Sequence, residues 1–377
     1  MNIIDLFAGC GGLSTGFEMA GFNVVLAIER DTAASETYRN NHNNTKLFTE
    51  DITKIIDLEY LLPNDIPIDG IIGSPPCQGF SMSGNRDKND PRNSLYIEYL
   101  RFVRHFKPKF FVMENVTGLL TMKTKAEEPL KDVILSEFKA IGYNVDYHVL
   151  NAADYGVPQT RQRVFFIGIR SDIQYDRDAL MPKKQYAPEQ YITIKDAISD
   201  LPPIKACEGT EIQSYPIEPQ NDYQKFMRKN STVVYNHIAM KHTKRLVDRF
   251  EHISYGQSVT DVPEEYQQRQ RGNASKISGK SYSQNNMRPF PDRPSPTIPA
   301  SFQSNFVHPF INRNYTAREG ARLQSFPDTY IFYGNRTNMS WDKALSQYQQ
   351  IGNAVPPLLA KAIGETIIKY FNNIKGV

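Results

Sequence analysis

The stretch DGIIGSPPCQ, residues 69–78, joins a short apolar run to two consecutive prolines and a cysteine. Short apolar runs bounded by glycine and proline are typical of buried strands. Strand pairing cannot continue through Pro75 and Pro76, because proline lacks the N–H group that a sheet requires. We therefore expect Cys77 at the carboxyl end of a strand, the edge at which open α/β sheets bind ligands.

Similar apolar runs alternate with helical patterns over the first 170 residues. The predicted strands are 2–7, 23–28, 70–73, 109–113, 144–150 and 164–169, and the predicted helices are 13–20, 32–40, 95–106 and 130–141. This alternation predicts the α/β class, with a doubly wound and mostly parallel sheet whose last parallel strand is 164–169.

The strand-helix rhythm is lost between residues 171 and 291 and returns afterwards. Helical patterns are present at 243–252, 317–326 and 354–371, and the last of these is long and amphipathic. We expect an α/β domain at 1–170, a smaller inserted region at 171–291 and a C-terminal segment at 292–377. The final helix of that segment should return to the first domain.

Positive charge is concentrated in the inserted region. The chain has 377 residues and a net charge of +3, yet residues 221–293 hold 13 Lys and Arg against 7 Asp and Glu. Such a local excess favours a polyanionic partner, although a solvated basic face explains it nearly as well. Three cysteines without a CxxC spacing indicate a reducing compartment and no structural metal site. No signal segment or long apolar run is present, so we expect a cytoplasmic protein without membrane contact.

The loop FAGCGG, residues 7–12, follows the first strand and opens the first helix. Its glycines let a ligand approach the backbone closely, and the helix N-terminus favours negative groups. The spacing is not GxGxxG, so a dinucleotide site is only weakly supported. Glu29 ends the second strand and can accept hydrogen bonds from ribose hydroxyls, while Asp51 and Ile52 can bracket an adenine. The loop and these residues together predict a nucleoside-containing ligand. Taken alone, the loop could be a plain tight turn, and Glu29 or Asp51 could be a surface carboxylate.

Three further side chains are candidates for chemistry. Glu114 lies among Phe111, Val112 and Val116, and such surroundings would raise its pKa and keep the acid protonated for donation to a ring nitrogen. Arg161 and Arg163 share one face of an extended segment. One of them can hold a carbonyl or phosphate, and the other a second anion or Glu114. Each of these residues also has a purely structural interpretation. Glu114 could be an acid at a helix N-terminus, Arg161 and Arg163 could be a solvated pair, and Cys77 could be a small buried hydrophobic residue.

Taken in order, these segments resemble the DNA (cytosine-5)-methyltransferase family, in particular its bacterial or phage type II modification enzymes. The matching motifs are residues 7–12, 75–78, 114–116, 159–163, 293–298, 318–328 and 350–357. The resemblance implies the S-adenosylmethionine-dependent methyltransferase fold, with the first domain as the catalytic and cofactor-binding domain. It makes the inserted region 171–291 a target-recognition region.

The resemblance also implies site residues and partners. The cofactor-binding positions correspond to Phe7, Gly9, Gly11, Gly12, Glu29, Arg30, Asp51, Ile52, Leu95, Asn353 and Val355, with Arg30 where the family often has an aromatic residue. Catalysis would use Cys77 as nucleophile on C6 of a flipped cytosine, Glu114 at N3, Arg163 at O2 and Arg161 on a phosphate or carboxylate. Segment 79–93 would close as a lid. The expected partners are duplex DNA with a specific cytosine site and, functionally, a restriction endonuclease; we expect a monomer.

Three other interpretations compete with this one. They are an RNA (tRNA) cytosine-5 methyltransferase of the same fold, a nicotinamide-dependent oxidoreductase, and a DNA-binding homologue without catalysis. The glycine spacing opposes the second, and the presence of both Cys77 and Glu114 opposes the third. The candidates for base or phosphate contacts are Arg228, Lys241, Arg245, Arg269, Arg271, Lys276, Asn285 and Arg288, which the sequence does not sort.

Overall fold

The computed structural model describes residues 1–63, 65–76, 95–124, 126–270, 272–278, 283–338 and 341–374, without the side chain of Ala274. Cys77, Arg271 and the predicted lid 79–93 lie outside the described residues. The chain forms two compact units. The sheet unit comprises residues 1–155, 162–185 and 354–377, and the second unit comprises 156–161 and 186–353. Residues 292–353 thus group with the inserted region, while the assignment of 171–291 to target recognition stays a prediction.

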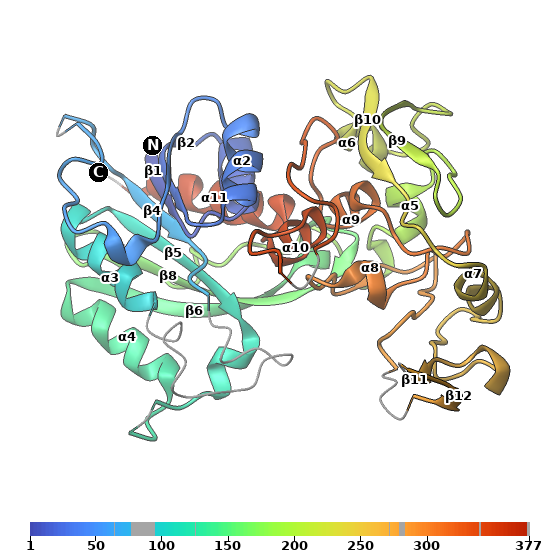
Figure 1. Ribbon diagram of the computed structural model, residues 1–377. Coiled ribbons are helices and arrows are strands. Elements are labelled where there is room, and N and C mark those ends of the chain that lie inside the picture. Colours follow the sequence, from blue (N-terminus) through green and yellow to red (C-terminus); the bar gives the residue numbers. More distant parts are fainter. Residues whose placement is uncertain are drawn as a thin grey trace. The chain divides into compact units, whose positions relative to one another are not determined.

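The sheet unit is built on seven strands in the order β3-β2-β1-β4-β5-β8-β6 (Figure 1). Their bounds are β1 (Asn2–Leu6), β2 (Asn23–Glu29), β3 (Lys46–Thr49), β4 (Gly70–Gly73), β5 (Phe110–Val116), β6 (Tyr143–Asn151) and β8 (Gln162–Arg170). All six predicted strands are present, which confirms the predicted α/β class. The short strand β3 was not predicted.

One strand runs in the direction opposite to the prediction. β8 pairs antiparallel with both β5 and β6, whereas the other neighbouring strands pair in parallel. The prediction of 164–169 as the last parallel strand is therefore wrong. A parallel pair needs a crossover connection of a dozen or more residues, usually a helix. Residues 152–161, which join β6 to β8, contain no α-helix, so the two strands pair antiparallel.

Helices cover both faces of this sheet (Figure 1). They are α1 (Gly12–Met19), α2 (Thr32–Asn41), α3 (Leu95–Phe106), α4 (Leu130–Ala140) and α11 (Pro357–Asn373). The apolar faces of α3 and α4 pack on alternate residues of the central strands, in a core that includes Phe102, Phe138, Ile71 and Phe111. On the other face, α11 packs on α1, and its Phe371 ring lies 5.8 Å from that of Phe110.

Two glycines permit the contact between α1 and the segment that leads into α11. A Cβ atom on Gly12 would lie 2.3 Å from the carbonyl oxygen of Val355. A Cβ atom on Gly16 would lie 2.3 Å from the carbonyl oxygen of Pro357. Any larger residue would push these segments apart. The predicted return of the final helix to the first domain is thus built into the glycines of α1.

The second unit has shorter elements. Its strands are β7 (Gln159–Thr160), β9 (Gly209–Ser214), β10 (Val233–Ile238), β11 (Arg269–Gln270), β12 (Asn273–Ile277) and β13 (Ser295–Pro296). Its helices are α5 (Ile194–Ile198), α6 (Asp222–Met227), α7 (Lys244–Glu251), α8 (Phe302–Asn305), α9 (Ala317–Leu323) and α10 (Gln347–Asn353). β9 pairs with β10, β11 with β12 and β7 with β13, so each small sheet has two strands.

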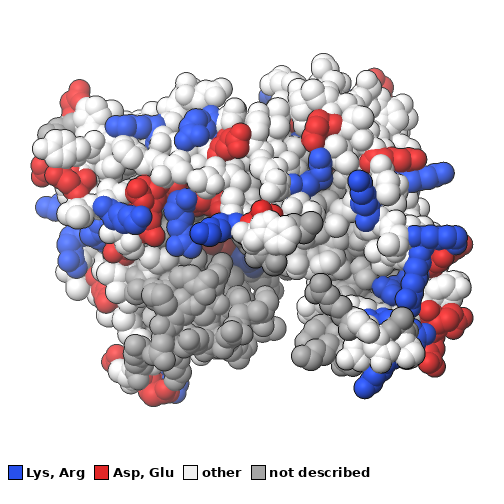
Figure 2. All heavy atoms as spheres, viewed as in Figure 1, with Lys and Arg blue, Asp and Glu red and all other residues white. Residues whose placement is uncertain are grey.

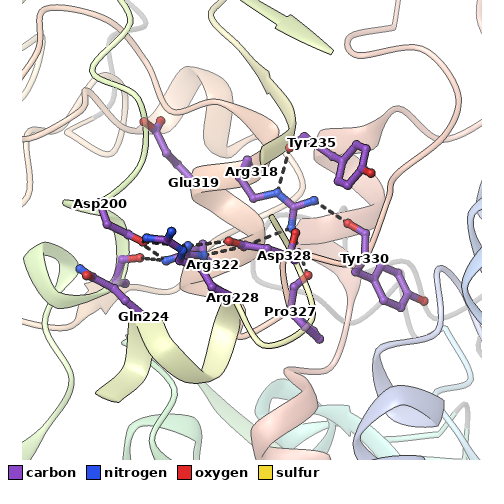
Figure 3. A network of polar contacts seen from close by, with 12 residues as sticks. Asp200, Gln224, Arg228, Tyr235, Arg318, Glu319, Arg322, Pro327, Asp328 and Tyr330 are labelled. Atoms are coloured by element: carbon purple, nitrogen blue, oxygen red, sulfur yellow. Dashed lines mark hydrogen bonds and ion pairs between the residues drawn. The ribbon is translucent and has the colours of Figure 1, made fainter. Parts of the chain in front are cut away.

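A buried network of charges surrounds α9 (Figure 3). Arg322 contacts Asp328 through Nε at 2.6 Å and Asp200 through Nη1 at 3.1 Å. Arg318, from the preceding turn of α9, donates to the carbonyl oxygen of Tyr235 in β10. These arginine and aspartate side chains are fully buried. The network therefore ties α9 to α5, β10 and the segment after α9.

Across the described residues, no helix combines the length and the hydropathy that a membrane span would need.

Candidate active site and cofactor loop

The glycine loop after β1 has an unusual backbone. Phe7, Gly9 and Gly11 have φ values of 58°, 56° and 90°. Positive φ costs energy for a residue with a side chain, and such strain is concentrated at functional sites. A Cβ atom built on Gly9 would meet no atom within 4 Å, so the space beside this residue is open. The loop therefore offers room for a ligand close to the backbone.

Glu29, at the end of β2, supports this loop. Its carboxylate accepts hydrogen bonds from the backbone N–H groups of Gly9 at 2.8 Å and Asp31 at 2.7 Å. Burial raises the pKa of Glu29, and the hydrogen bonds from Asp31 and Gly9 oppose that shift. Each carboxylate oxygen still has a second lone pair, because a carboxylate has about four acceptor positions. The group can thus hold the loop and accept ribose hydroxyls at once.

The next part of the predicted cofactor site follows β3. Asp51 accepts hydrogen bonds from the N–H and hydroxyl of Thr53, and its Oδ2 lies 3.8 Å from Nη1 of Arg30. Ile52 is buried in the core, whereas Arg30 is largely exposed. The structure thus places Arg30, at the position where the family often stacks an aromatic residue on the adenine, beside Asp51, one of the two residues predicted to bracket it. Leu95 is the first residue of α3 and is partly buried.

Two predicted cofactor residues flank the connection into α11. Val355 is buried in the sheet unit, with its carbonyl oxygen against Gly12 of the glycine loop. Asn353 ends α10, is exposed and belongs to the second unit. The structure thus links Val355, but not Asn353, to the loop.

Glu114 and Arg163 form the candidate catalytic pair. Both lie on neighbouring strands, and Nε of Arg163 is 3.1 Å from Oε1 of Glu114. Glu114 is 8% exposed and lies within β5, which extends to Val116 rather than ending at residue 113 as predicted. The predicted contact between one of the two arginines and Glu114 is confirmed. Glu114 therefore has a guanidinium beside it as well as the predicted apolar neighbours, and its protonation stays a prediction.

Asn115 is a residue whose role the sequence did not reveal. Its buried side chain donates from Nδ2 to the carbonyl oxygen of Pro75 at 3.0 Å. That bond ties the end of β5 to the proline turn immediately before Cys77. Tyr99 of α3 adds a second link, because its hydroxyl contacts the carbonyl oxygens of Ile71 at 2.8 Å and Val112 at 3.0 Å. The presence of Asn directly after Glu114 was the only available signal.

Asp5 is a second residue that was not predicted. It is fully buried in β1, and its Oδ2 accepts a 2.6 Å hydrogen bond from Ser14 at the start of α1. Ser14 also contacts the hydroxyl of Tyr38 at 2.7 Å. Burial raises the pKa of Asp5 to about 7, against the opposing hydrogen bond from Ser14. A titratable group therefore lies directly beneath the glycine loop.

Arg161 and Arg163 are divided between the two units. Arg161 is 2% exposed and donates to the carbonyl oxygens of Ile298 and Gly352, both at 2.9 Å in the second unit. Arg163 belongs to the sheet unit. β7 ends at Thr160 and β8 begins at Gln162, so the segment is not one continuous strand. A catalytic role for Arg161 stays a prediction, and its contacts favour a role in holding the backbone of the second unit.

Comparison with known proteins identifies the family of this chain. A family model of the C-5 cytosine-specific DNA methylases matches residues 1–369. This chain belongs to that family. A type II methyltransferase, M.DdeI of Desulfomicrobium norvegicum, is 62% identical over 99% of this chain and 90% of its own length. Another, M1.HphI of Haemophilus parahaemolyticus, is 37% identical over 99% of this chain and 88% of its own.

Solved structures agree with the fold. The crystal structure of a candidate DNA modification methyltransferase encoded within an E. coli prophage has a TM-score of 0.76 and 28% identity. That match covers 99% of this chain and all of the other. The S. pombe Dnmt2 methyltransferase, at a TM-score of 0.58 and 17% identity, covers 99% of this chain and supports the fold alone.

Membership of this methylase family settles the general activity. The protein is a DNA (cytosine-5) methyltransferase of the type II modification group, and the family generally uses S-adenosylmethionine. The nicotinamide-dependent oxidoreductase is thereby excluded. The glycine loop, Glu29 and the Arg30–Asp51 pair have open space and acceptor groups that fit a nucleoside cofactor.

Proposed function

We propose that this enzyme methylates C5 of a cytosine flipped out of a specific duplex DNA site, through a covalent adduct with Cys77. The observation that carries the proposal is the Glu114–Arg163 pair, held on β5 and β8 beside the turn that leads to Cys77. Gly73, the last residue of β4, pairs with Met113 of β5. Glu114 and the Pro75-Pro76 segment that precedes Cys77 in the sequence therefore lie at the same edge of the sheet, which is where such sheets bind ligands.

The cofactor would bind at the glycine loop of the sheet unit. S-adenosylmethionine supplies an electrophilic methyl group on a sulfonium. The Gly9 and Gly11 backbone would lie against its amino-acid part, Glu29 would accept from the ribose hydroxyls, and Asp51 and Ile52 would flank the adenine. Arg30, already 3.8 Å from Asp51, would lie over the adenine as a guanidinium plane.

The chain's own residues would then activate the base. C5 of cytosine is too electron-poor to attack a methyl group. The Cys77 thiolate forms a bond to C6, Glu114 donates a proton to N3, and C5 becomes an enamine nucleophile. Arg163 holds O2 and stabilises the carboxylate that the proton leaves behind. After the methyl transfer, water takes the C5 proton, the thiolate is expelled from C6 so that the C5–C6 double bond forms again, and the N3 proton returns to Glu114.

Glu114 must carry a proton when the reaction begins, although it faces Arg163 in the free protein. Binding of the base resolves the conflict, because Arg163 would turn part of its hydrogen bonding to O2 and weaken its hold on Glu114. C6 is inaccessible inside a duplex, so the cytosine must leave the helix. The type II relatives also support a functional pairing with a restriction endonuclease and favour DNA over tRNA as substrate.

Trapping of the adduct tests this proposal. The protein is incubated with S-adenosylmethionine and a duplex containing 5-fluorocytosine, since fluorine at C5 blocks the final elimination. The methylated site is first found by bisulfite sequencing of DNA from cells that express the enzyme. A covalent protein–DNA product should form with the wild type, not with Cys77→Ser, and more slowly by ~10²-fold or more with Glu114→Gln.

The matched control is Glu128→Gln, which neutralises an exposed carboxylate of the same unit and should react at the wild-type rate. A wild-type enzyme that methylates the site without forming the adduct would refute the role of Cys77. Label transferred to tRNA but not to duplex DNA would refute the proposed substrate.

A further inference from the structure

Arg288 is a buried cation that connects two segments of the second unit. It is 7% exposed. Its Nε donates to the carbonyl oxygen of Ile253 at 2.6 Å, and its Nη2 donates to those of Phe250 at 2.6 Å and to Oδ1 of Asn312 at 2.8 Å. Its Nη1 donates to the carbonyl oxygen of His308 at 2.7 Å. One guanidinium therefore joins the C-terminal end of α7 to residues 308–312.

The region that Arg288 joins has a small apolar core. We call residues 241–270, 272–278 and 283–312 the α7 lobe. Its described core cluster consists of Phe250, Ile253, Val262 and Val307, with Leu246 and Tyr266 partly buried against it. So few apolar contacts do little to fix the direction of a short helix, because apolar packing is non-directional. Charge-assisted hydrogen bonds have defined geometry and can supply the missing direction.

A second buried arginine carries this support on to the β11–β12 hairpin. Nε of Arg249, in α7, donates to the carbonyl oxygen of Tyr266. The Tyr266 ring lies 3.9 Å from that of His252, at the end of α7. Tyr266 is three residues before the hairpin begins at Arg269. Arg288 therefore holds the end of α7, and α7 in turn holds the segment that leads into the hairpin.

The outer surface of the lobe carries a different set of cations. Lys241, Arg245 and Lys276 are exposed, and among the described residues none of them has a carboxylate partner. Lys244 differs, because it pairs with Asp248 at 2.9 Å. Figure 2 shows Lys and Arg side chains around α7 and the hairpin, with acidic side chains between them. Long, exposed and unpaired cations are the groups that contact phosphates.

Burial thus sorts the candidate DNA contacts that the sequence left together. Arg228 lies in the α9 network, 3.4 Å from Asp200 and over the Tyr215 ring, so it is committed to the fold. Arg288 is committed in the same way. Arg269, partly buried, donates to the carbonyl oxygen of Glu264. Arg245 makes a longer contact, 3.5 Å from its Nη2 to the carbonyl oxygen of Gln267, and is exposed like Lys241 and Lys276, so these three keep their charges available.

We propose that Arg288 is a positioning residue for target recognition: it orients α7 and the hairpin so that Lys241, Arg245 and Lys276 meet the phosphates of duplex DNA. Arg288 itself does not contact DNA. This inference rests on the proposed function, because it concerns how that enzyme holds its substrate. The inference assigns two roles to the cations of the lobe: Arg288 sets the orientation of α7 and the hairpin, and Lys241, Arg245 and Lys276 supply the charge that contacts phosphates.

The experiment compares Arg288→Met and Arg288→Lys with the wild-type enzyme. The first readout is the ratio of methylation rates on the recognised duplex and on one with a single recognised base pair changed. Arg288→Met should lower this ratio by about tenfold or more, because phosphate contacts fix the register in which the protein reads the bases, and each base contact that is lost removes about that much discrimination. Arg288→Lys should give an intermediate ratio, because three ammonium donors cannot serve all the acceptors. The affinity for S-adenosylmethionine should stay unchanged in both.

The second readout is the salt dependence of binding to a duplex without the recognised site. For this duplex, Arg288→Met should keep the wild-type slope of log K against log salt concentration, because Lys241, Arg245 and Lys276 keep their charges and contact the phosphates of a non-specific duplex without a fixed register. Lys241→Gln, Arg245→Gln and Lys276→Gln should each reduce the slope by about 1 and weaken binding to all sequences alike. Lys195→Gln, an exposed cation of α5, is the matched control and should change nothing.

Several results would overturn the inference. A slope reduced by about 1 in Arg288→Met would make Arg288 a phosphate contact, and a wild-type selectivity ratio would remove its positioning role. If neither Arg288 variant folds, as judged by thermal unfolding, Arg288 serves the fold and not recognition. Unchanged slopes in all three lysine and arginine variants would refute the phosphate surface. Failure of the proposed function is a separate result, in which the wild type leaves no 5-methylcytosine in any duplex.

Discussion

The interior of the sheet unit and the interior of the second unit differ in the side chains that fill them. In the sheet unit the largest fully buried side chains are aromatic, such as Phe102, Phe111 and Phe138. In the second unit they include three arginines, Arg313, Arg318 and Arg322, all with no exposed surface, beside Tyr315 and Tyr348. Arg313 makes a bidentate contact with Glu319, through Nη1 at 2.8 Å and Nη2 at 2.7 Å.

The difference follows from the lengths of the elements. A seven-stranded sheet with helices on both faces excludes enough water to be stabilised by apolar burial. Two-stranded sheets and helices of one or two turns cannot bury an equal area. Buried ion pairs add little net stability, because desolvation offsets their attraction, but they impose a geometry. In the second unit, loss of one partner of a buried ion pair should therefore cost most of the stability that the pair protects. In the sheet unit, the free energy of unfolding should fall in proportion to the apolar group that is removed.

The largest expected effect comes from breaking the α9 network. Arg322→Met leaves Asp328 and Asp200 buried without their main cation, and should lower the free energy of unfolding by ~3–5 kcal/mol. Urea unfolding followed by far-ultraviolet circular dichroism measures it, because Trp341, the chain's one tryptophan, is 75% exposed and would report unfolding weakly. Lys195→Met, at an exposed position, should change stability by less than ~0.5 kcal/mol. A loss below 1 kcal/mol in Arg322→Met would remove the distinction between the units.

A second, smaller effect is expected from Asp5, a buried acid of the sheet unit that has no cation partner among the described residues. Asp5 has a pKa raised to about 7 by burial, against ~3.9 in an unfolded chain. The folded state therefore binds more protons between these values, and stability should fall as pH rises through that window. The slope cannot exceed about 1.4 kcal/mol per pH unit.

Asp5→Asn should reduce that slope by the contribution of Asp5, because the amide can still accept from Ser14 and does not ionise. Urea unfolding at pH 5 and pH 8 measures the change. The α9 network predicts the opposite sign: burial opposes ionisation of Asp328, but Arg322 outweighs it and lowers the pKa. Its contribution is present above the unfolded pKa and lost in acid. An Asp5→Asn variant with the wild-type pH dependence would contradict the assignment of the slope to Asp5.

The sequence predicted the elements of the sheet unit because its strands are buried on both faces. The run at 70–73 and its neighbours are apolar and bounded by glycine or proline, which marks them without tertiary information. The direction of β8 was missed, since hydrophobic periodicity does not record the direction of a strand. The pairing of Glu114 with an arginine was predicted as one option, and strand register made it specific.

The second unit was much less predictable. Arg228, Arg288, Lys241 and Arg245 were equivalent candidates for DNA contact, because all are cations in one basic segment. Only burial separates them. Acceptors such as the carbonyl oxygens of Phe250 and His308 exist in every sequence, so a cation held by backbone oxygens leaves no pattern to find. Asp5 was missed for the related reason that its partner Ser14 is not distinctive.

The smallest expected effect tests the expectation for the sheet unit. Ile71, fully buried in β4, lies between Ile4 of β1 and Phe111 of β5. Ile71→Val removes one methylene group and should lower the free energy of unfolding by ~0.5–1.5 kcal/mol, through lost apolar burial and a small cavity. Ile56→Val, at a position that is 90% exposed, is the matched control and should stay within ~0.5 kcal/mol of wild type. If Ile71→Val cost as much as Arg322→Met, the loss in the sheet unit would not be in proportion to the apolar group removed, and length of elements would not explain the difference between the units.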